Sequence, residues 1–174
     1  MNNFYEQFAE SVRRFPAGIA VEVQRPQSLE RYTYAELAAL ADSAARFLSG
    51  RGFARGDRAA ILADNDAHWC AVYLGLLRLG AVPVPLDTAY KPAQIAALLR
   101  DSGAKVLFTS GKYLAASEEA VRACSPSPEI VLLHGAGVGA RYIVPLHLEI
   151  SSTQPDMPPC PATLDDPAVI LYTS

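Results

Sequence analysis

Apolar residues at helical spacing open the chain. Phe4, Phe8, Val12 and Phe15 follow one another at intervals of four, four and three residues, which places them on one face of a helix. A proline and a glycine come next and interrupt this pattern, and residues 19–23 then alternate between apolar and polar side chains as in a half-buried strand. The start of the chain is therefore predicted to be an amphipathic helix followed by a strand.

The next pattern predicts a hairpin and a capped helix. A polar segment containing a proline indicates a hairpin loop, and residues 31–34 are expected to form the returning strand. Thr33 and Glu36 have the spacing of a capping box, in which each side chain accepts a hydrogen bond from the backbone amide of the other residue. Gly50 and Gly52 suit left-handed positions at the end of that helix.

From residue 58 onward, short apolar runs alternate with helical patterns. Residues 58–62 form the first apolar run, and either Asp64 or Asn65 is expected to cap the helix that follows. Gly80 ends this helix near residue 79, and residues 81–86 continue as extended chain. Two prolines in this extended run are unexpected, because each removes a hydrogen-bond donor from what the pattern indicates to be a central strand.

The alternation then repeats and sets the fold class. A helix, a glycine and a strand are predicted within residues 95–110, followed by a helix to about residue 124 and a strand at 129–133. Strands that alternate with helices of these lengths pair in parallel through right-handed crossovers. We therefore predict an α/β fold with a mostly parallel β-sheet flanked by helices, preceded by an N-terminal helix and a β-hairpin.

The last part of the chain changes character twice. Residues 151–167 contain five prolines among small polar residues, so this segment is expected to cross the surface without forming a helix or a ladder. An apolar run at residues 168–172 follows and is predicted to be a buried parallel strand. Thr173 and Ser174 come directly after it, at the strand end where open α/β sheets place their ligands.

Composition narrows the class of protein. Of the 174 residues, 51% are hydrophobic, which favours a folded chain, and the net charge is −3 with no basic run that would bind a nucleic acid. No segment has the pattern of a signal peptide or the length of a membrane span. The three cysteines lie far apart without metal-ligand spacing, so a disulfide or zinc framework is not expected, and a reducing cytoplasm is the predicted compartment.

One glycine-rich segment allows two interpretations. Gly135, Gly137 and Ala140 follow a predicted strand with the spacing of a dinucleotide-binding turn. That turn requires a helix next, whereas the residues that follow are β-branched and include Pro145. A glycine-rich hairpin loop is the preferred interpretation.

Other candidate chemistry has ordinary structural explanations. Ser102 and Lys105 have the S-x-x-K spacing of some acyl-transfer enzymes, but they lie where a helix ends rather than where one begins. His68, His134 and His147 have no metal-ligand spacing with one another or with the cysteines. We therefore assign no catalytic residue in this chain.

Four segments together resemble the adenylate-forming enzymes of the AMP-binding superfamily, in the acyl-CoA synthetase class that includes long-chain fatty-acid–CoA ligases. The sequence "RYTYAEL" at residues 31–37 resembles the first core motif of the family, and residues 56–87 are similar to the second. "DSGAKVLFT" at 101–109 matches a further family segment, and "DDPAVILYTS" at 165–174 is similar to the approach to the third motif, a phosphate loop.

The resemblance implies a reaction and two binding residues. Full-length members of the family use ATP and magnesium to convert a carboxylic acid into an acyl-adenylate, and then transfer the acyl group to a thiol, commonly that of coenzyme A. By resemblance, Thr173 contacts phosphate or magnesium and Ser174 is the next residue of the phosphate loop. The acid is expected to be a fatty acid, and the choice between coenzyme A and a carrier protein as acceptor stays open.

Two departures from the family pattern leave the substrate subclass undecided. Lys91 precedes Pro92 where family members often have Thr or Ser, which gives a poorer N-cap. Residues 112–164 resemble no family segment.

The resemblance also implies that this chain is an N-terminal fragment of a longer enzyme. We expect residues 1–52 to form a helix, hairpin and capped helix that pack on a second sheet built from later sequence, and residues 53–174 to form an α/β subdomain that stops where the phosphate loop starts. Such a fragment is expected to be inactive and to bind no cofactor. Without the second sheet, the apolar faces that include Phe4, Phe8, Leu37 and Leu40 are expected to repack, to become mobile or to bury against a second molecule, and the last of these gives a homodimer through the N-terminal region. The alternatives are a free-standing α/β binding module and a protein-interaction module without ligase chemistry.

Overall fold

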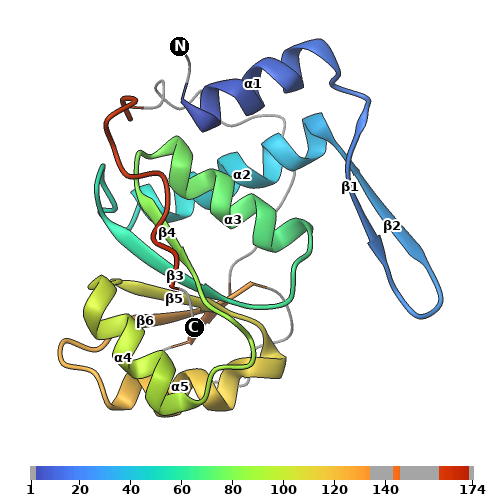
Figure 1. Cartoon of the computed structure of the whole chain (residues 1–174). Helices are drawn as coiled ribbons and strands as arrows, with labels where there is room; N and C mark the ends of the chain where they lie inside the picture. The colour runs from blue at the N-terminus through green and yellow to red at the C-terminus, as the bar shows by residue number, and fades with distance from the viewer. Residues whose placement is uncertain (1–2, 134–142, 146–160, 173–174) are drawn as a thin grey trace. The chain divides into compact units, whose positions relative to one another are not determined.

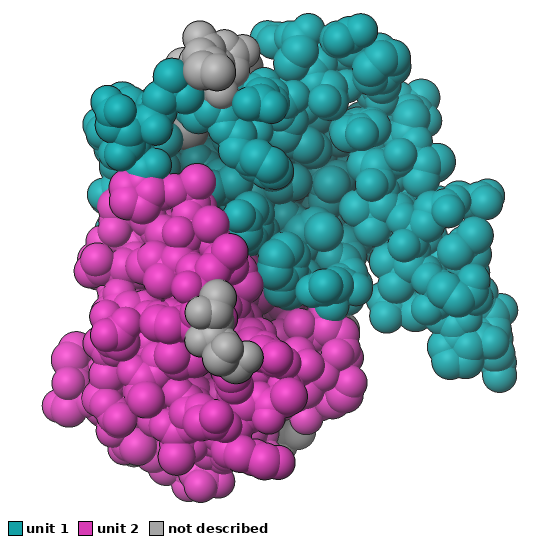
Figure 2. Space-filling view, in the orientation of Figure 1, with its two compact units in different colours: residues 1–55, 65–80, 148–166 teal, residues 56–64, 81–147, 167–174 magenta. Residues whose placement is uncertain are grey.

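The computed structural model describes residues 3–133, 143–145 and 161–172. The chain forms two compact units (Figure 2), the first built from residues 1–55, 65–80 and 148–166 and the second from residues 56–64, 81–147 and 167–174. The predicted segment 1–52 falls within the first unit, which also takes in a later helix.

The first unit contains three helices and an antiparallel hairpin (Figure 1): α1 (Phe4–Arg14), β1 (Ile19–Gln24), β2 (Leu29–Thr33), α2 (Tyr34–Ser49) and α3 (Ala67–Arg78). The predicted N-terminal helix and hairpin are confirmed. The hairpin pairs Glu22 with Arg31 across its two strands, and the Arg31 Nε lies 2.7 Å from the Glu22 Oε1 as an exposed ion pair.

The predicted capping box opens α2. The Thr33 amide donates to the Glu36 Oε2 at 2.8 Å, and the Glu36 amide donates to the Thr33 Oγ1 at 3.2 Å. The Thr33 amide, followed by the Thr33 hydroxyl, which also donates to the Glu36 Oε2 at 2.9 Å, holds the pKa of the Glu36 carboxyl below its ordinary value. A second box of the same kind, between Asn3 and Glu6, opens α1. Gly52 at the end of α2 has the expected positive φ of 76°, whereas Gly50 has a φ of −61° and is not left-handed.

The residue that caps α3 is Asp66, so the prediction of Asp64 or Asn65 is wrong. The Asp66 Oδ1 accepts hydrogen bonds from the backbone amides of His68 and Trp69, both at 2.9 Å. Its backbone is extended, with φ −149° and ψ −174°, which is the conformation that a capping residue needs.

Helices α2 and α3 pack closely through small residues. Leu37, Leu40, Ala41, Ala71 and Leu74 form the core between them. A side chain at Gly75 would place its Cβ atom 2.8 Å from the carbonyl oxygen of Ala41, so only glycine allows this approach. The alanines and this glycine therefore set the distance between the two helices.

The second unit is a parallel sheet of five strands in the order β4-β3-β5-β6-β7 (Figure 1), which confirms the predicted α/β fold class. Its elements are β3 (Arg58–Leu62), β4 (Val82–Pro85), α4 (Pro92–Ser102), β5 (Val106–Thr109), a 3₁₀ turn (Gly111–Tyr113), α5 (Leu114–Arg122), β6 (Glu129–Leu132) and β7 (Ile143–Pro145).

Alternate residues of the strands meet α4 and α5 in one core. Ala60 and Leu62 from β3, Leu107 from β5 and Ile130 from β6 pack with residues of the two helices, among them Leu99. The two helices thus cover one face of the sheet. At the end of α4, Gly103 has a φ of 62° and forms a left-handed C-cap, so the helix ends at the glycine that the sequence indicates.

The two prolines of β4 are explained by its position, because β4 lies at an edge of the described sheet and not at its centre. The Val82 amide donates to the Asp57 carbonyl at 2.7 Å, and the Leu86 amide donates to the Ile61 carbonyl at 2.9 Å. Both amides therefore point toward the β3 side of the strand. N–H groups alternate along a strand, so Pro83 lies between them on the outer side, where no ladder donor is needed.

The hairpin interpretation of the glycine-rich segment is wrong, because β6 and β7 pair in parallel, with Ile130 opposite Ile143. Strands joined by a tight hairpin run antiparallel, so parallel pairing rules out a hairpin between β6 and β7. Gly135, Gly137 and Ala140 themselves lie outside the described residues.

Candidate functional site

The carboxyl ends of the parallel strands lie along one edge of the second unit, which is the edge where open α/β sheets place ligands. Thr109, the last residue of β5, is fully buried there. Its hydroxyl donates to the Leu62 carbonyl at the end of β3, at 3.0 Å, and accepts from the Ser117 hydroxyl of α5, also at 3.0 Å. Thr109 thus ties the strand ends together, and its one hydroxyl proton is used within the fold.

A charged cluster also joins the ends of β3 and β5. The Lys112 Nζ lies 2.9 Å from the Asp64 Oδ2, and the Tyr113 hydroxyl donates to the Asp64 Oδ1 at 2.5 Å. Two hydrogen bonds raise the pKa of Lys112 to about 12, with the larger effect from Tyr113 and the smaller from Asp64. The Lys112 and Asp64 side chains are 64% and 57% exposed, so this is a solvated ion pair of modest energy.

The segment that leads to the end of the chain lies against the same unit, but it is not the buried strand that its apolar residues predict. Residues 167–172 form no strand, and Leu171 is 67% exposed. The Ile170 amide donates to the Pro83 carbonyl at 3.1 Å. The physical reason is the outer edge of β4, where prolines offer carbonyl acceptors but no N–H donors, so a regular ladder cannot form.

Tyr172 fixes the end of this segment through its side chain. Its hydroxyl donates to the Asp101 Oδ2 of α4 at 2.7 Å, and its ring packs with Ile170 against the core beneath α4. Burial has the largest effect on the pKa of the Tyr172 phenol, and the hydrogen bond to Asp101 adds to it. Together they raise this pKa to about 12. No short-range pattern in the sequence indicates this contact, because the two residues are 71 positions apart.

The predicted binding residues Thr173 and Ser174 lie outside the described residues, as do His134, His147 and Cys160. Their roles stay predictions. In the part of the chain that the structure describes, no three His, Cys, Asp or Glu side chains gather as metal ligands.

The S-x-x-K pair is structural, as expected. The Ser102 hydroxyl donates to the Leu98 carbonyl at 2.7 Å within α4, and the Lys105 Nζ pairs with the Asp57 Oδ1 at 2.6 Å. Neither group is available to activate the other. At the start of α4, Lys91 makes no side-chain cap, in agreement with its predicted weakness, and the Gln94 Oε1 accepts from the Lys91 amide at 2.9 Å instead.

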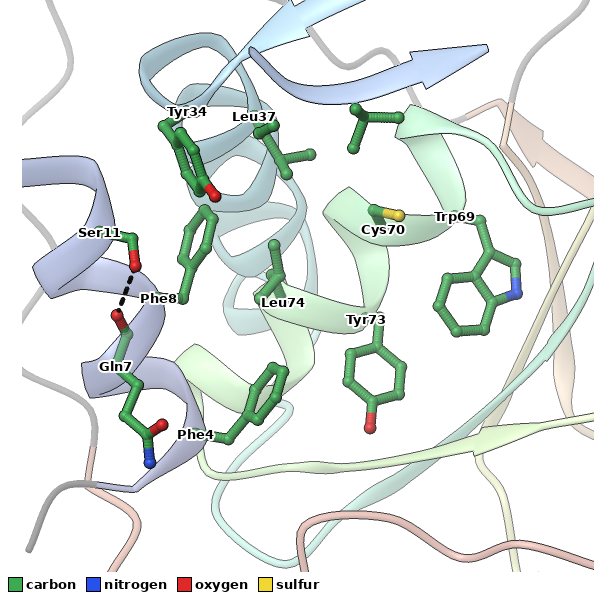
Figure 3. Close-up of a pocket in the computed structure, with 12 residues that line it drawn as sticks. Phe4, Gln7, Phe8, Ser11, Tyr34, Leu37, Trp69, Cys70, Tyr73 and Leu74 are labelled. Carbon is green, nitrogen blue, oxygen red and sulfur yellow. Dashed lines mark hydrogen bonds between the residues drawn. The ribbon is translucent and has the colours of Figure 1, made fainter. Parts of the chain in front are cut away.

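The first unit has an apolar groove of about 570 Å³ between α1, β1, α2 and α3 (Figure 3). Aromatic side chains dominate its wall: the Trp69 and Tyr73 rings stack at 5.2 Å, and Phe4 meets Tyr73 edge-on at 6.5 Å. Burial raises the pKa values of Tyr73 and of the neighbouring Cys70 thiol. The groove therefore offers apolar contact area and no charged group for catalysis.

None of the helices in the described part of the chain combines the length and the apolar character that crossing a bilayer requires.

Comparison with known proteins gives a consistent picture. The family model for AMP-binding enzymes matches residues 8–174. The chain is 34% identical over 149 residues to the long-chain-fatty-acid–CoA ligase FadD13 of Mycobacterium tuberculosis, which covers 86% of the chain and 28% of that enzyme. It is 28% identical over 144 residues to a 3-hydroxybenzoate–CoA ligase of an Aromatoleum species, covering 82% of the chain and 27% of that enzyme.

A solved structure agrees with these relatives. The inhibitor-bound N-terminal domain of FACL13 from Mycobacterium tuberculosis superimposes with a TM-score of 0.80 at 28% sequence identity, covering 100% of the chain and 42% of that structure. The chain thus spans less than half of the length of each of these proteins.

Proposed function

Because the chain belongs to the family of AMP-binding enzymes, we propose that it is part of an ATP-dependent ligase that joins a carboxylic acid to a thiol. The observation that carries this proposal is the match to the AMP-binding family model, which runs to residue 174. Two features of the fold support it: the parallel sheet, and the segment that leads to Thr173 and Ser174 at the end of the chain.

The proposed reaction has two steps. The carboxylate of the acid attacks the α-phosphorus of ATP, which forms an acyl-adenylate and releases pyrophosphate. A thiolate then attacks the acyl carbonyl carbon, which forms the thioester and releases AMP. Both steps develop negative charge on phosphate or carbonyl oxygens, so a site that aims hydrogen-bond donors at those oxygens accelerates them.

In this chain the proposed donors are Thr173 and Ser174. Hydroxyls and consecutive backbone amides form an anion-binding concavity suited to phosphate oxygens. Thr173 is also the proposed contact to magnesium. One hydroxyl does not make a metal site, and the described residues bring no group of three acidic, histidine or cysteine ligands together. No step is therefore assigned to the metal.

We propose a fatty acid as the substrate, on the strength of the 34% identity to a ligase named for long-chain fatty acids. The 3-hydroxybenzoate–CoA ligase among the relatives makes aryl acids the alternative class. Coenzyme A is the proposed acceptor, since both relatives are named as CoA ligases. The proposed compartment is the cytoplasm, in keeping with the free thiols of Cys70 and Cys124.

The 174-residue chain alone is proposed to be inactive and to bind no cofactor. If it ends at Ser174, a free carboxylate stands where phosphates are proposed to dock, and like charges repel. A longer protein replaces that carboxylate with a peptide bond.

A second candidate is an interaction module without ligase chemistry. The apolar groove of the first unit favours it, because an aromatic-lined surface of this kind is suited to a protein partner. The proposed partner is a second copy of this chain.

The test of the proposed function is product identification. The protein translated from the complete reading frame is incubated with ATP, magnesium, coenzyme A and a panel of fatty and aryl acids, and the products are identified by mass spectrometry. We expect an acyl-adenylate without coenzyme A and an acyl-CoA with it. A protein that forms neither product from any acid contradicts the proposed function and leaves the interaction module.

A further inference from the structure

The β1–β2 hairpin has only a shallow apolar attachment to the rest of the first unit. At its base, Ala20, Val21 and Tyr32 pack on the core between α2 and α3. None of residues 19–33 is fully buried, and a two-stranded hairpin has little stability of its own. Any further contact with the helices therefore matters for where the hairpin lies.

Arg25 makes such a contact at the other end of β1. Its Nη2 lies 3.0 Å from the Glu30 Oε2 within the hairpin and 3.6 Å from the Asp66 Oδ2 at the start of α3. The Asp66 side chain is 5% exposed, whereas that of Arg25 is 39% exposed. A buried carboxylate destabilises a fold unless a cation or hydrogen-bond donors compensate its charge. Arg25 is thus the cation that the hairpin supplies to Asp66.

The elements that this ion pair joins are two walls of the apolar groove (Figure 3). Strand β1 contributes Ala20 and Val21 to the groove, and the first turn of α3 contributes Trp69 and Cys70. Asp66 caps that turn, because its Oδ1 accepts from the Trp69 amide at 2.9 Å. The contact between Arg25 and Asp66 therefore holds the hairpin wall to the α3 wall.

We propose that the β1–β2 hairpin is a movable wall of the apolar groove, and that the ion pair between Arg25 and Asp66 is the latch that holds this wall against α3. When the latch opens, the hairpin turns about its half-buried base, and Trp69 and Cys70 become more accessible to a partner. The inference concerns the first unit alone and does not rest on the proposed ligase function.

The charge of the latch makes the groove sensitive to salt. Arg25 is partly exposed, so dissolved ions reach it and weaken its attraction to Asp66. The apolar contacts at the base of the hairpin carry no charge and are not screened in this way. Salt is therefore expected to open the groove without detaching the base of the hairpin.

The first experiment measures acrylamide quenching of Trp69, the one tryptophan in the 174-residue chain. R25Q removes the cation of the latch, and R25K keeps a cation there as the conservative rescue. The matched control is R31Q, which removes the exposed ion pair with Glu22 inside the same hairpin. The quenching constant is measured at low salt and at about 0.5 M sodium chloride, where screening is nearly complete beyond a few ångströms.

We expect R25Q to raise the quenching constant at low salt roughly 2-fold, with R25K and R31Q close to the wild type. High salt is expected to raise the constant of the wild type and not that of R25Q. R25Q equal to R31Q, or R25K as strongly quenched as R25Q, overturns the latch. Should R25Q fail to fold, the salt series on the wild type is the test, and a wild type that salt leaves unchanged overturns the latch.

A second measurement follows alkylation of the Cys70 thiol by iodoacetamide, with the modified peptide quantified by mass spectrometry. Loss of the Arg25 charge does not favour the reactive thiolate, so faster alkylation reports opening of the groove. R25Q is expected to speed the reaction of Cys70 roughly 3- to 10-fold, while R31Q leaves it unchanged. Equal alkylation rates in R25Q and wild type overturn the movable wall.

Discussion

Gly75 is the residue on which the contact between α2 and α3 depends most sharply. Its missing side chain lets the Ala41 carbonyl and the Ala44 methyl group approach to 2.8 and 2.9 Å of where a Cβ atom would lie. Contacts this short force one helix to move, and overpacking of this kind commonly costs about 1–3 kcal/mol.

We therefore predict that G75A lowers the free energy of unfolding by about 1–2 kcal/mol, although alanine itself favours helix by about 1 kcal/mol. Urea denaturation, monitored by circular dichroism, measures this free energy of unfolding. G111A is the control, because a Cβ atom at Gly111 has no neighbour within 4 Å. A G75A variant as stable as G111A would show that the helices can separate at no cost.

Asp166 is a residue whose charge state the structure clearly perturbs. Its Oδ1 accepts from the Arg55 guanidinium at 2.8 Å and its Oδ2 from the Thr163 amide at 2.6 Å. The bond to Arg55, followed by that to Thr163, lowers the pKa of the carboxyl from 3.8 to about 2. The folded state therefore favours the ionised carboxylate.

This pKa shift makes the stability of the folded state depend on pH. Because the folded pKa lies below the unfolded value, the stabilisation is present above about pH 4 and disappears as the pH falls to about 2. We predict that the urea midpoints of wild type and D166N differ at pH 6 and converge below pH 4. The control is D165N, which changes the neighbouring exposed carboxylate. If the urea midpoints of wild type and D166N still differ at pH 2, the effect does not come from the charge of Asp166.

At the scale of single elements, the N-cap of α3 is a feature that the local sequence alone does not determine. Asp64, Asn65 and Asp66 are all capable of capping, and the sequence offers no way to rank them. The choice falls on Asp66 because the chain is extended there and because its Oδ2 lies 3.6 Å from Arg25 of the hairpin. Asp64 is engaged by Lys112 instead.

We predict that D66A lowers the free energy of unfolding by about 1–2 kcal/mol through loss of the cap. D64A removes only an exposed ion pair and is expected to cost under about 1 kcal/mol. Thermal unfolding of the two variants in parallel distinguishes them. A larger loss for D64A than for D66A would contradict the assignment of the cap to Asp66.

How far the sequence predicts each element depends on the range of the interaction. The box between Thr33 and Glu36 and the end of α4 at Gly103 depend on neighbours a few residues away, and both are confirmed. The apolar residues 168–172 satisfy a strand pattern, but their pairing depends on prolines more than 80 positions earlier. The bond between Tyr172 and Asp101 spans 71 positions, so no short-range pattern could indicate it.

At the scale of the whole molecule, the family and the fold class could be predicted, because motifs and strand–helix alternation are spread over the chain. The two binding residues, Thr173 and Ser174, stay predictions, since they lie outside the described residues. The chain spans 28% of the length of FadD13. The activity of a whole ligase is accordingly a proposal about the protein that contains this chain.

The first unit leads to a prediction about assembly. Phe4 at the groove is 58% exposed, and Phe15 and Ile19 nearby in sequence are 54% and 48% exposed. We predict that the 174-residue chain dimerises through this surface, and that light scattering over a concentration series shows a rising mass. F4E is expected to keep it monomeric, whereas L171E in the second unit is the control. A wild-type chain that stays monomeric at every concentration contradicts this prediction.

The central claim, that this chain is part of an acid-activating ligase, is tested most directly by acid-dependent pyrophosphate release from ATP. The protein from the complete reading frame and the 174-residue chain are assayed side by side with the same panel of fatty and aryl acids. The account predicts release above the acid-free blank from the complete protein and none from the 174-residue chain. Release from neither protein with any acid, or equal release from both, would contradict it.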